Sequence, residues 1–336
     1  VFPYEAKLTP EDIYHLSKLA IMEYLTSGIT ANADMYLTPD TMIEASRDCG
    51  YRTTVIGAVN NFTQSVELLD EWYKKYHKKE NLINFELGFH AEYTTKKEIL
   101  EGIADLAEKY KAPVYTHNSE SESEVAQCIE RTKVTPTVYM DRLGIFNYGG
   151  GFYHCVHMTQ NDLDIVKEHN ISVITNPASN LKLASGIAPI DHMLKEGINL
   201  AIGTDGPASN NCLDMFREMF LVTALAKYRE NDASAVDALE VLKMATIGGA
   251  KAMNLTDCDV LAEGKEADII MIDLNQPNMQ PIHNIQKNLV YSGSKQNVKL
   301  TMVAGKILYE NGEFFIGTDA YKIYEKANDI AERIVK

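Results

Sequence analysis

The 336-residue sequence contains no uninterrupted apolar run long enough to cross a membrane. A transmembrane helix needs about 18 or more consecutive apolar residues, so we expect no membrane partner. Basic residues are also scarce, because 32 Lys and Arg stand against 47 Asp and Glu and leave a net charge of −15. A chain this acidic is poorly suited to phosphate backbones. The balance argues against nucleic acid and favours a small-molecule partner.

Cysteine is infrequent and carries no recognisable pattern. The five cysteines are odd in number and widely spaced, and no CxxC occurs. This excludes a disulfide framework and a Cys-rich zinc site, and it predicts a reducing, cytoplasmic location. No GxGxxG follows a predicted strand, which argues against a dinucleotide-binding sheet.

Short apolar segments alternate with longer amphipathic ones along most of the chain. The apolar runs occupy 29–35, 53–59, 83–91, 113–119, 151–158, 171–177 and 199–206. The helical patterns between them include 10–27, 65–77, 96–110, 120–132, 159–169 and 187–196. Continuous apolar strands that alternate with helices are typical of a parallel sheet built from βαβ units.

Most of these runs end in polar residues, namely Asp34, Asn60, His90, His117, His154, Asn176 and Asp205. Polar chemistry at successive carboxyl ends is how a (β/α)8 barrel builds its active site. Seven strands are one short of a closed barrel. We therefore predict a (β/α)8 TIM-like barrel over 1–256 whose first strand is absent from this chain. Short strands with Gly and Asn turns predict part of a small β-sandwich over 257–316, and 317–336 reads as a C-terminal helix.

His117 is followed three residues later by Glu120. A histidine ligand beside a carboxylate that moves protons is what metal-assisted hydrolysis requires. The alternative is an ordinary polar loop with satisfied hydrogen bonds. His154 and His157 are spaced so that only one can face inward along a strand, and we expect this to be His154. The alternative for each is a buried structural histidine.

Asp205 lies in the segment GTDGPASNN after an apolar run. A carboxylate there can bind a divalent cation and accept a proton from water. The alternative is a turn cap, because Asp-Gly-Pro is strong turn chemistry. His90 ends another strand and could hydrogen-bond a ring nitrogen of a substrate.

Seven segments carry a family resemblance and run in family order from about residue 27 to residue 273. They are SGITANADMY, THNSE, HCVHM, NPASNLKLASGIAPI, IGTDGPASNNCLDMF, ATIGGAKAM and GKEADIIMID. With them the sequence resembles the amidohydrolase superfamily, and most closely its 5-methylthioadenosine/S-adenosylhomocysteine deaminase branch.

The resemblance implies a barrel, a β-sandwich and one divalent metal, zinc or alternatively iron. By position, His117 resembles the metal ligand of strand 5, and Asp205 resembles the ligand and proton acceptor of strand 8. Glu120 resembles the proton shuttle, and His154 the histidine beside the attacking water. His90 resembles a substrate-contacting histidine, and Glu5 a carboxylate that holds ribose hydroxyls.

The sequence also departs from the family pattern. No His-x-His occurs, so the two metal ligands of the first barrel strand are missing, and Thr175 and Asn118 stand where relatives often carry other residues. We expect the intact protein to have roughly fifty further N-terminal residues that supply this strand. The alternative is a truncated, inactive barrel without metal.

The resulting hypothesis is a metal-dependent aminohydrolase of small-molecule substrates. It would convert 5-methylthioadenosine, S-adenosylhomocysteine or adenosine into the inosine analogue and ammonia. Two alternatives remain: an amidohydrolase of the guanine, cytosine, pterin or triazine type, and a metal-free barrel that only binds ligands. By analogy with the family we also expect a homo-oligomer.

Overall fold

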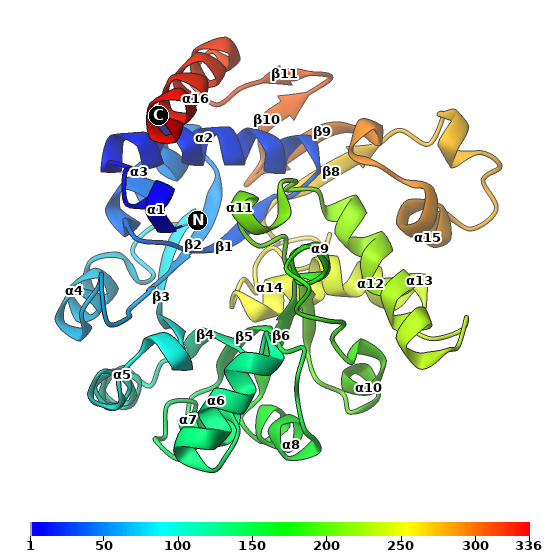
Figure 1. The fold of residues 1–336 in the computed structure, drawn as a ribbon. Coiled ribbons are helices and arrows are strands. Elements are labelled where there is room, and N and C mark those ends of the chain that lie inside the picture. Colours follow the sequence, from blue (N-terminus) through cyan, green and yellow to red (C-terminus); the bar gives the residue numbers. More distant parts are fainter. Residues whose placement is uncertain (1) are drawn as a thin grey trace.

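The computed structural model describes residues 2–336, in which seven parallel strands form one curled sheet that follows chain order (Figure 1). The strands are β1 (Ala31–Met35), β2 (Arg52–Ile56), β3 (Ile83–Ala91), β4 (Val114–Asn118), β5 (Gly150–His154), β6 (Ile171–Thr175) and β7 (Leu200–Ile202). Each predicted apolar run overlaps one of them, which confirms the predicted open form of a (β/α)8 barrel. β1 pairs only with β2 and β7 only with β6, so among the described residues no strand closes the sheet.

Helices cover the outer face of this sheet (Figure 1). Those of the barrel are α3 (Pro39–Cys49), α4 (Val66–Tyr76), α5 (Lys97–Tyr110), α6 (Glu122–Thr132), α7 (Pro136–Asp141), α8 (Gln160–Glu168), α9 (Pro177–Lys182), α10 (Ile190–Lys195), α11 (Pro207–Asn210), α12 (Met215–Glu230), α13 (Ala238–Lys243) and α14 (Gly249–Ala252). Local sequence explains where several begin. Ser121 and Thr159 each form a capping box, which satisfies the free N–H groups at the start of α6 and α8.

Several predicted strand ends lie beyond the observed ones. The run at 53–59 ends as a strand at Ile56, and the run at 151–158 ends at His154, where the backbone turns into the left-handed region. The helical segment that follows α12 begins at Ala238 and is interrupted by a π-helical turn at Met244–Gly248.

A second, antiparallel sheet packs beside the barrel. It consists of β8 (Ile269–Ile272), β9 (Val298–Val303), β10 (Lys306–Glu310) and β11 (Glu313–Phe314). The helices α2 (Pro10–Thr26) and α16 (Ala320–Val335) contact each other next to this sheet (Figure 1). The short helices α1 (Phe2–Glu5) and α15 (Ile285–Lys287) complete the α-helices of the described chain. No described helix has both the length and the apolar character needed to cross a membrane.

A small cluster of apolar side chains fills the inside of the curled sheet. Met35, Ile56, Tyr115, Tyr153 and Ile174 belong to one cluster contributed by five different strands. The polar residues at the carboxyl ends of the strands lie to one side of this apolar cluster, at one mouth of the barrel. The fold therefore places the predicted site residues where parallel barrels bind ligands.

Candidate active site

His117, near the end of β4, has one ring nitrogen fixed and one free. Its Nδ1 lies 2.8 Å from the carbonyl oxygen of His90, and because a carbonyl only accepts, Nδ1 carries the hydrogen. Its Nε2 therefore keeps a lone pair. Burial, followed by the nearby charge of His154, lowers the pKa of His117 to about 4. The imidazole is neutral at physiological pH and suited to binding a metal.

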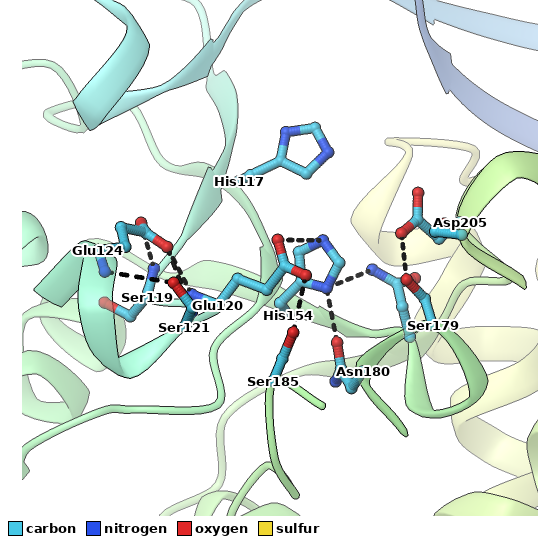
Figure 2. Close-up of polar contacts among 12 residues, drawn as sticks. His117, Ser119, Glu120, Ser121, Glu124, His154, Ser179, Asn180, Ser185 and Asp205 are labelled. Carbon is cyan, nitrogen blue, oxygen red and sulfur yellow. Dashed lines mark hydrogen bonds and ion pairs between the residues drawn. The ribbon is translucent and has the colours of Figure 1, made fainter. Parts of the chain in front are cut away.

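His154, the last residue of β5, is 1% exposed and adopts a left-handed backbone with φ of 72°. Its ring centroid lies 5.4 Å from that of His117. Nδ1 lies 2.7 Å from Oδ1 of Asn180, and Nε2 lies 3.8 Å from Oε2 of Glu120 (Figure 2). The structure therefore brings His117, His154 and Glu120 to one side of the mouth.

Glu120 lies in the turn between β4 and α6, and this turn is held by Glu124. The Glu124 carboxylate accepts hydrogen bonds from the N–H groups of Ser119 at 3.0 Å and of Glu120 at 2.9 Å. The Glu120 side chain is consequently directed back over the mouth, where the hydroxyl of Ser185 donates to its Oε1 at 3.0 Å (Figure 2). A carboxylate held in this position can reach a ligand above His154.

Asp205 follows β7 by three residues and also has a left-handed backbone, with φ of 58°. The Ser179 hydroxyl donates to its Oδ2 at 2.5 Å, and the Gly206 N–H donates to its Oδ1 at 2.6 Å. Burial opposes ionisation of Asp205, but the neighbouring His154, the Ser179 hydrogen bond and the neighbouring His117 outweigh it and lower the pKa of Asp205. Asp205 is thus an anion facing the two histidines (Figure 2).

The loop before Asp205 passes close to Asn176, the residue that follows β6. A Cβ on Gly203 would lie 2.3 Å from Oδ1 of Asn176 and 3.0 Å from Cγ2 of Ile174. Only glycine permits this approach. The Gly203 N–H donates to the carbonyl of Thr175 at 2.9 Å, which extends the β6–β7 pairing to the edge of the site.

His90 and Glu5 lie at the same mouth. The His90 ring centroid is 5.0 Å from that of His117, and burial, followed by the charge of His117, lowers the pKa of His90 to about 4. The charges of Glu120 and Glu5 act on the pKa of His90 in the opposite direction but do not cancel the lowering. Burial and then the Glu5 carboxylate raise the pKa of Tyr36.

His117 and Asp205 have the donor chemistry that a divalent cation needs, a neutral imidazole and an anionic carboxylate. Catalytic zinc sites usually have three protein ligands. Within residues 2–336, however, no group of three or more His, Cys, Asp or Glu side chains is arranged to hold a metal ion. The described chain fits as part of a metal site that requires at least one further ligand.

Four polar residues around this cluster escaped the sequence-based prediction: Ser179, Asn180, Ser185 and Glu218. Three belong to the segment NPASNLKLAS after β6. Polar residues are equally common in an ordinary surface helix, so their presence in this segment does not indicate a functional site. Glu218 had a detectable signal, because it is an acidic residue on the same helix face as the buried Met219 and Val222 and is 0% exposed. A charge on an apolar helix face is expected only where it is hydrogen-bonded.

Comparison with known proteins places this site in a family. The amidohydrolase family profile matches residues 3–308. The chain belongs to the amidohydrolase family. Similar relatives of this amidohydrolase include the 5-methylthioadenosine/S-adenosylhomocysteine deaminase of Caldanaerobacter subterraneus subsp. tengcongensis, 37% identical over 100% of this chain and 79% of the relative. The 5'-deoxyadenosine deaminase of Methanopyrus kandleri is 34% identical over 99% and 79%.

Solved structures agree with this assignment. A zinc-bound adenosine deaminase from Xanthomonas campestris superposes with a TM-score of 0.95 at 32% identity, covering 99% of the amidohydrolase described here and 78% of that chain. The atrazine chlorohydrolase of Arthrobacter aurescens TC1, complexed with zinc, gives a TM-score of 0.88 at 23% identity over 97% and 78%. The second likeness supports the fold alone.

Proposed function

We propose that this amidohydrolase removes the 6-amino group of an adenine nucleoside by hydrolysis, forming the inosine analogue and ammonia. The observation that carries the proposal is the convergence of His117, Glu120, His154 and Asp205 at one mouth (Figure 2). These residues lie at or just after the carboxyl ends of three different strands, in a chain 37% identical to a 5-methylthioadenosine/S-adenosylhomocysteine deaminase. Identity at this level over the whole chain favours the deaminases over guanine, cytosine, pterin or triazine hydrolases.

A divalent cation completes the proposal, and zinc is favoured because the Xanthomonas adenosine deaminase contains it. His117 Nε2 and the Asp205 carboxylate would hold this ion together with a further ligand. When bound, such an ion lowers the pKa of a coordinated water to about 7, so that a nucleophile exists at neutral pH.

The side chains of this chain then have separate roles. Asp205, an anion that faces His117 and His154, accepts a proton from the water that attacks the amino-bearing carbon. Glu120 delivers a proton to the adjacent ring nitrogen, because its carboxylate hangs over the mouth and is oriented by Ser185. Both O–H bonds of the water break in the course of the reaction: Asp205 passes the first proton to the leaving amino nitrogen, and Glu120, having protonated the ring nitrogen, takes the second when the new C–O bond becomes a carbonyl and the C–N bond to ammonia breaks.

Recognition of the nucleoside falls to His90 and Glu5. His90 is neutral, since its pKa is lowered to about 4, and it can hydrogen-bond a ring nitrogen. The Glu5 carboxylate, whose charge acts on the pKa of both Tyr36 and His90, can accept hydrogen bonds from the two ribose hydroxyls. A carboxylate in this role favours nucleosides over free bases.

The test is ammonia release and loss of adenine absorbance with full-length protein purified with zinc in the buffer. Methylthioadenosine, S-adenosylhomocysteine, 5'-deoxyadenosine and adenosine form the panel, with guanine, cytosine, a pterin and a triazine as controls. We expect turnover of at least one adenine nucleoside and none of the controls. Turnover of a control compound and of no adenine nucleoside would show that the substrate class is that of the control. Zinc-loaded protein without any turnover would favour a barrel that only binds ligands.

A further inference from the structure

The short helix α9 contacts both His154 and Asp205. Asn180, 1% exposed, presents its Oδ1 to Nδ1 of His154 at 2.7 Å. The preceding Ser179, 0% exposed, donates its hydroxyl to Asp205 at 2.5 Å. Two consecutive residues of one helical turn thus hold groups that follow two different strands, β5 and β7 (Figure 2).

α9 is itself fixed from behind by Glu218 of α12. The Glu218 carboxylate accepts a hydrogen bond from the N–H of Ala178 at 3.0 Å and another from Nδ2 of Asn210 at 2.8 Å. The same Asn210 amide donates to the carbonyl of Thr204 at 2.6 Å, immediately before Asp205. One buried carboxylate therefore joins the start of α9 to the loop that carries Asp205.

The Asn180 contact has a chemical consequence for His154. An amide oxygen can only accept, so the ring nitrogen facing it carries the hydrogen and the other ring nitrogen has the lone pair. Nδ2 of Asn176 is 3.5 Å from the same Nδ1, which is too long to compete with the 2.7 Å contact. The lone pair is then on Nε2, which lies 3.8 Å from Oε2 of Glu120.

We propose that Asn180 is a positioning residue that holds His154 as the Nδ1–H tautomer, with Glu218 keeping α9 in the register this requires. In this tautomer Nε2 accepts a hydrogen bond from the attacking water. In the opposite tautomer Nε2 would present a hydrogen to that water and orient it wrongly. The inference rests on the proposed function for the identity of the water, but the tautomer itself is a property of the protein without substrate.

The experiment is long-range ¹H–¹⁵N correlation spectroscopy of full-length protein labelled with ¹⁵N-histidine, without substrate. The His154 ring signals are assigned by their loss in His154→Gln. We expect a protonated Nδ1 and an unprotonated Nε2 in the wild type. Asn180→Asp keeps an acceptor oxygen and should preserve this pattern, whereas Asn180→Leu, of similar size, removes the acceptor and should shift His154 toward Nε2–H. Glu218→Gln should give a mixture although Asn180 is intact.

Kinetics supply a second readout. Asn180→Leu should lower kcat by about 10- to 100-fold, the usual cost of losing an outer-shell partner, with KM nearly unchanged. Asn180→Asp should retain more activity than Asn180→Leu. An Nε2–H signal for wild-type His154, or the same tautomer in wild type and Asn180→Leu, would overturn the proposal. Absence of turnover with the Nδ1–H tautomer present would instead contradict the proposed function, so the two failures are distinguishable.

Discussion

Arg52 and Asp268 form a buried two-point ion pair that joins the barrel to the antiparallel sheet. Nε and Nη2 of Arg52 donate to the two carboxylate oxygens of Asp268 at 2.8 and 2.9 Å, and the side chains are 4% and 3% exposed. Asp268 also accepts from the N–H of Ala304 at 2.7 Å, next to β9. One carboxylate therefore holds a barrel strand and a sheet strand together.

Asp268→Ala should be strongly destabilising, because it removes the two-point carboxylate partner of a buried guanidinium and leaves Arg52 only the Asn81 carbonyl at 3.1 Å and the Glu266 carboxylate at 3.9 Å. We expect a loss of about 3–5 kcal/mol in the free energy of unfolding, measured by urea denaturation. Glu101→Ala is the control, since Glu101 pairs with Lys97 on the exposed surface of α5 and should cost less than about 1 kcal/mol. Similar losses of unfolding free energy in both variants would contradict the conclusion that the buried Arg52–Asp268 pair stabilises the fold more than a surface ion pair does.

Glu120→Gln should remove proton delivery without altering the shape of the turn. We expect kcat on the active nucleoside to fall by about 10²- to 10⁴-fold with a much smaller change in KM. Glu122→Gln is the matched control, because Glu122 lies two residues away on the exposed face of α6. A loss of activity in Glu122→Gln as large as in Glu120→Gln would show that the turn, and not the carboxylate of Glu120, matters.

His117→Ala should weaken zinc binding to full-length protein. Losing an outer-shell partner typically costs about 10- to 100-fold in metal affinity, so loss of a direct ligand should cost at least that much. Competition with a chromogenic chelator measures the affinity. His283→Ala, in an exposed loop, should bind zinc like the wild type. Unchanged affinity in His117→Ala would remove His117 from the metal site.

Glu86 predicts a pH dependence of stability. Burial raises the pKa of Glu86 to about 7, only partly offset by a hydrogen bond from Asn84, and its Oε2 is buried without a partner. His77 lies 3.7 Å away, and burial lowers its pKa, so it is not a reliable cationic partner. The folded protein thus holds a proton that the unfolded chain loses near pH 4.3.

The pKa of Glu86 is higher in the folded protein than in the unfolded chain. The bound proton therefore contributes its full stabilisation below the unfolded pKa, and this contribution is lost as the pH rises to about 7. Glu86→Gln, which cannot ionise, should escape this loss. Comparing urea unfolding at about pH 5 and pH 8, we expect the variant to gain on the order of 1–3 kcal/mol relative to wild type at the higher pH. A stability difference that is equal at both pH values would contradict the prediction.

The sequence was most informative where one physical effect dominates. Buried parallel strands need continuous apolar runs, so all seven strands were predictable, and parallel strands end at one edge, so His117 and Asp205 were expected to share a mouth. α3 was not among the predicted helices, because its segment PDTMIEASRDC mixes charged and apolar residues and buries small or polar ones such as Ala45 and Ser46 alongside Met42 and Ile43. The ends of β2 and β5 were misplaced because an apolar residue fits a buried turn as well as a strand.

The partners of the site residues were beyond sequence reasoning for a different reason. Asn180 reaches His154 across 26 positions and Glu218 reaches Ala178 across 40, and such distances depend on how α9 and α12 pack. No local pattern encodes this packing. Chemistry-bearing residues can therefore be named from a sequence, whereas the residues that orient them require the fold.

The left-handed backbone at His154 and Asp205 has a consequence for attempts to make this protein more robust. Such conformations cost about 1–3 kcal/mol each in ordinary residues, and they persist here because the surrounding hydrogen bonds enforce them. Selection for heat tolerance alone would reward glycine at both positions and thereby delete the imidazole and the carboxylate. Thermostable variants should be sought in the outer helices, with these two strand termini left untouched.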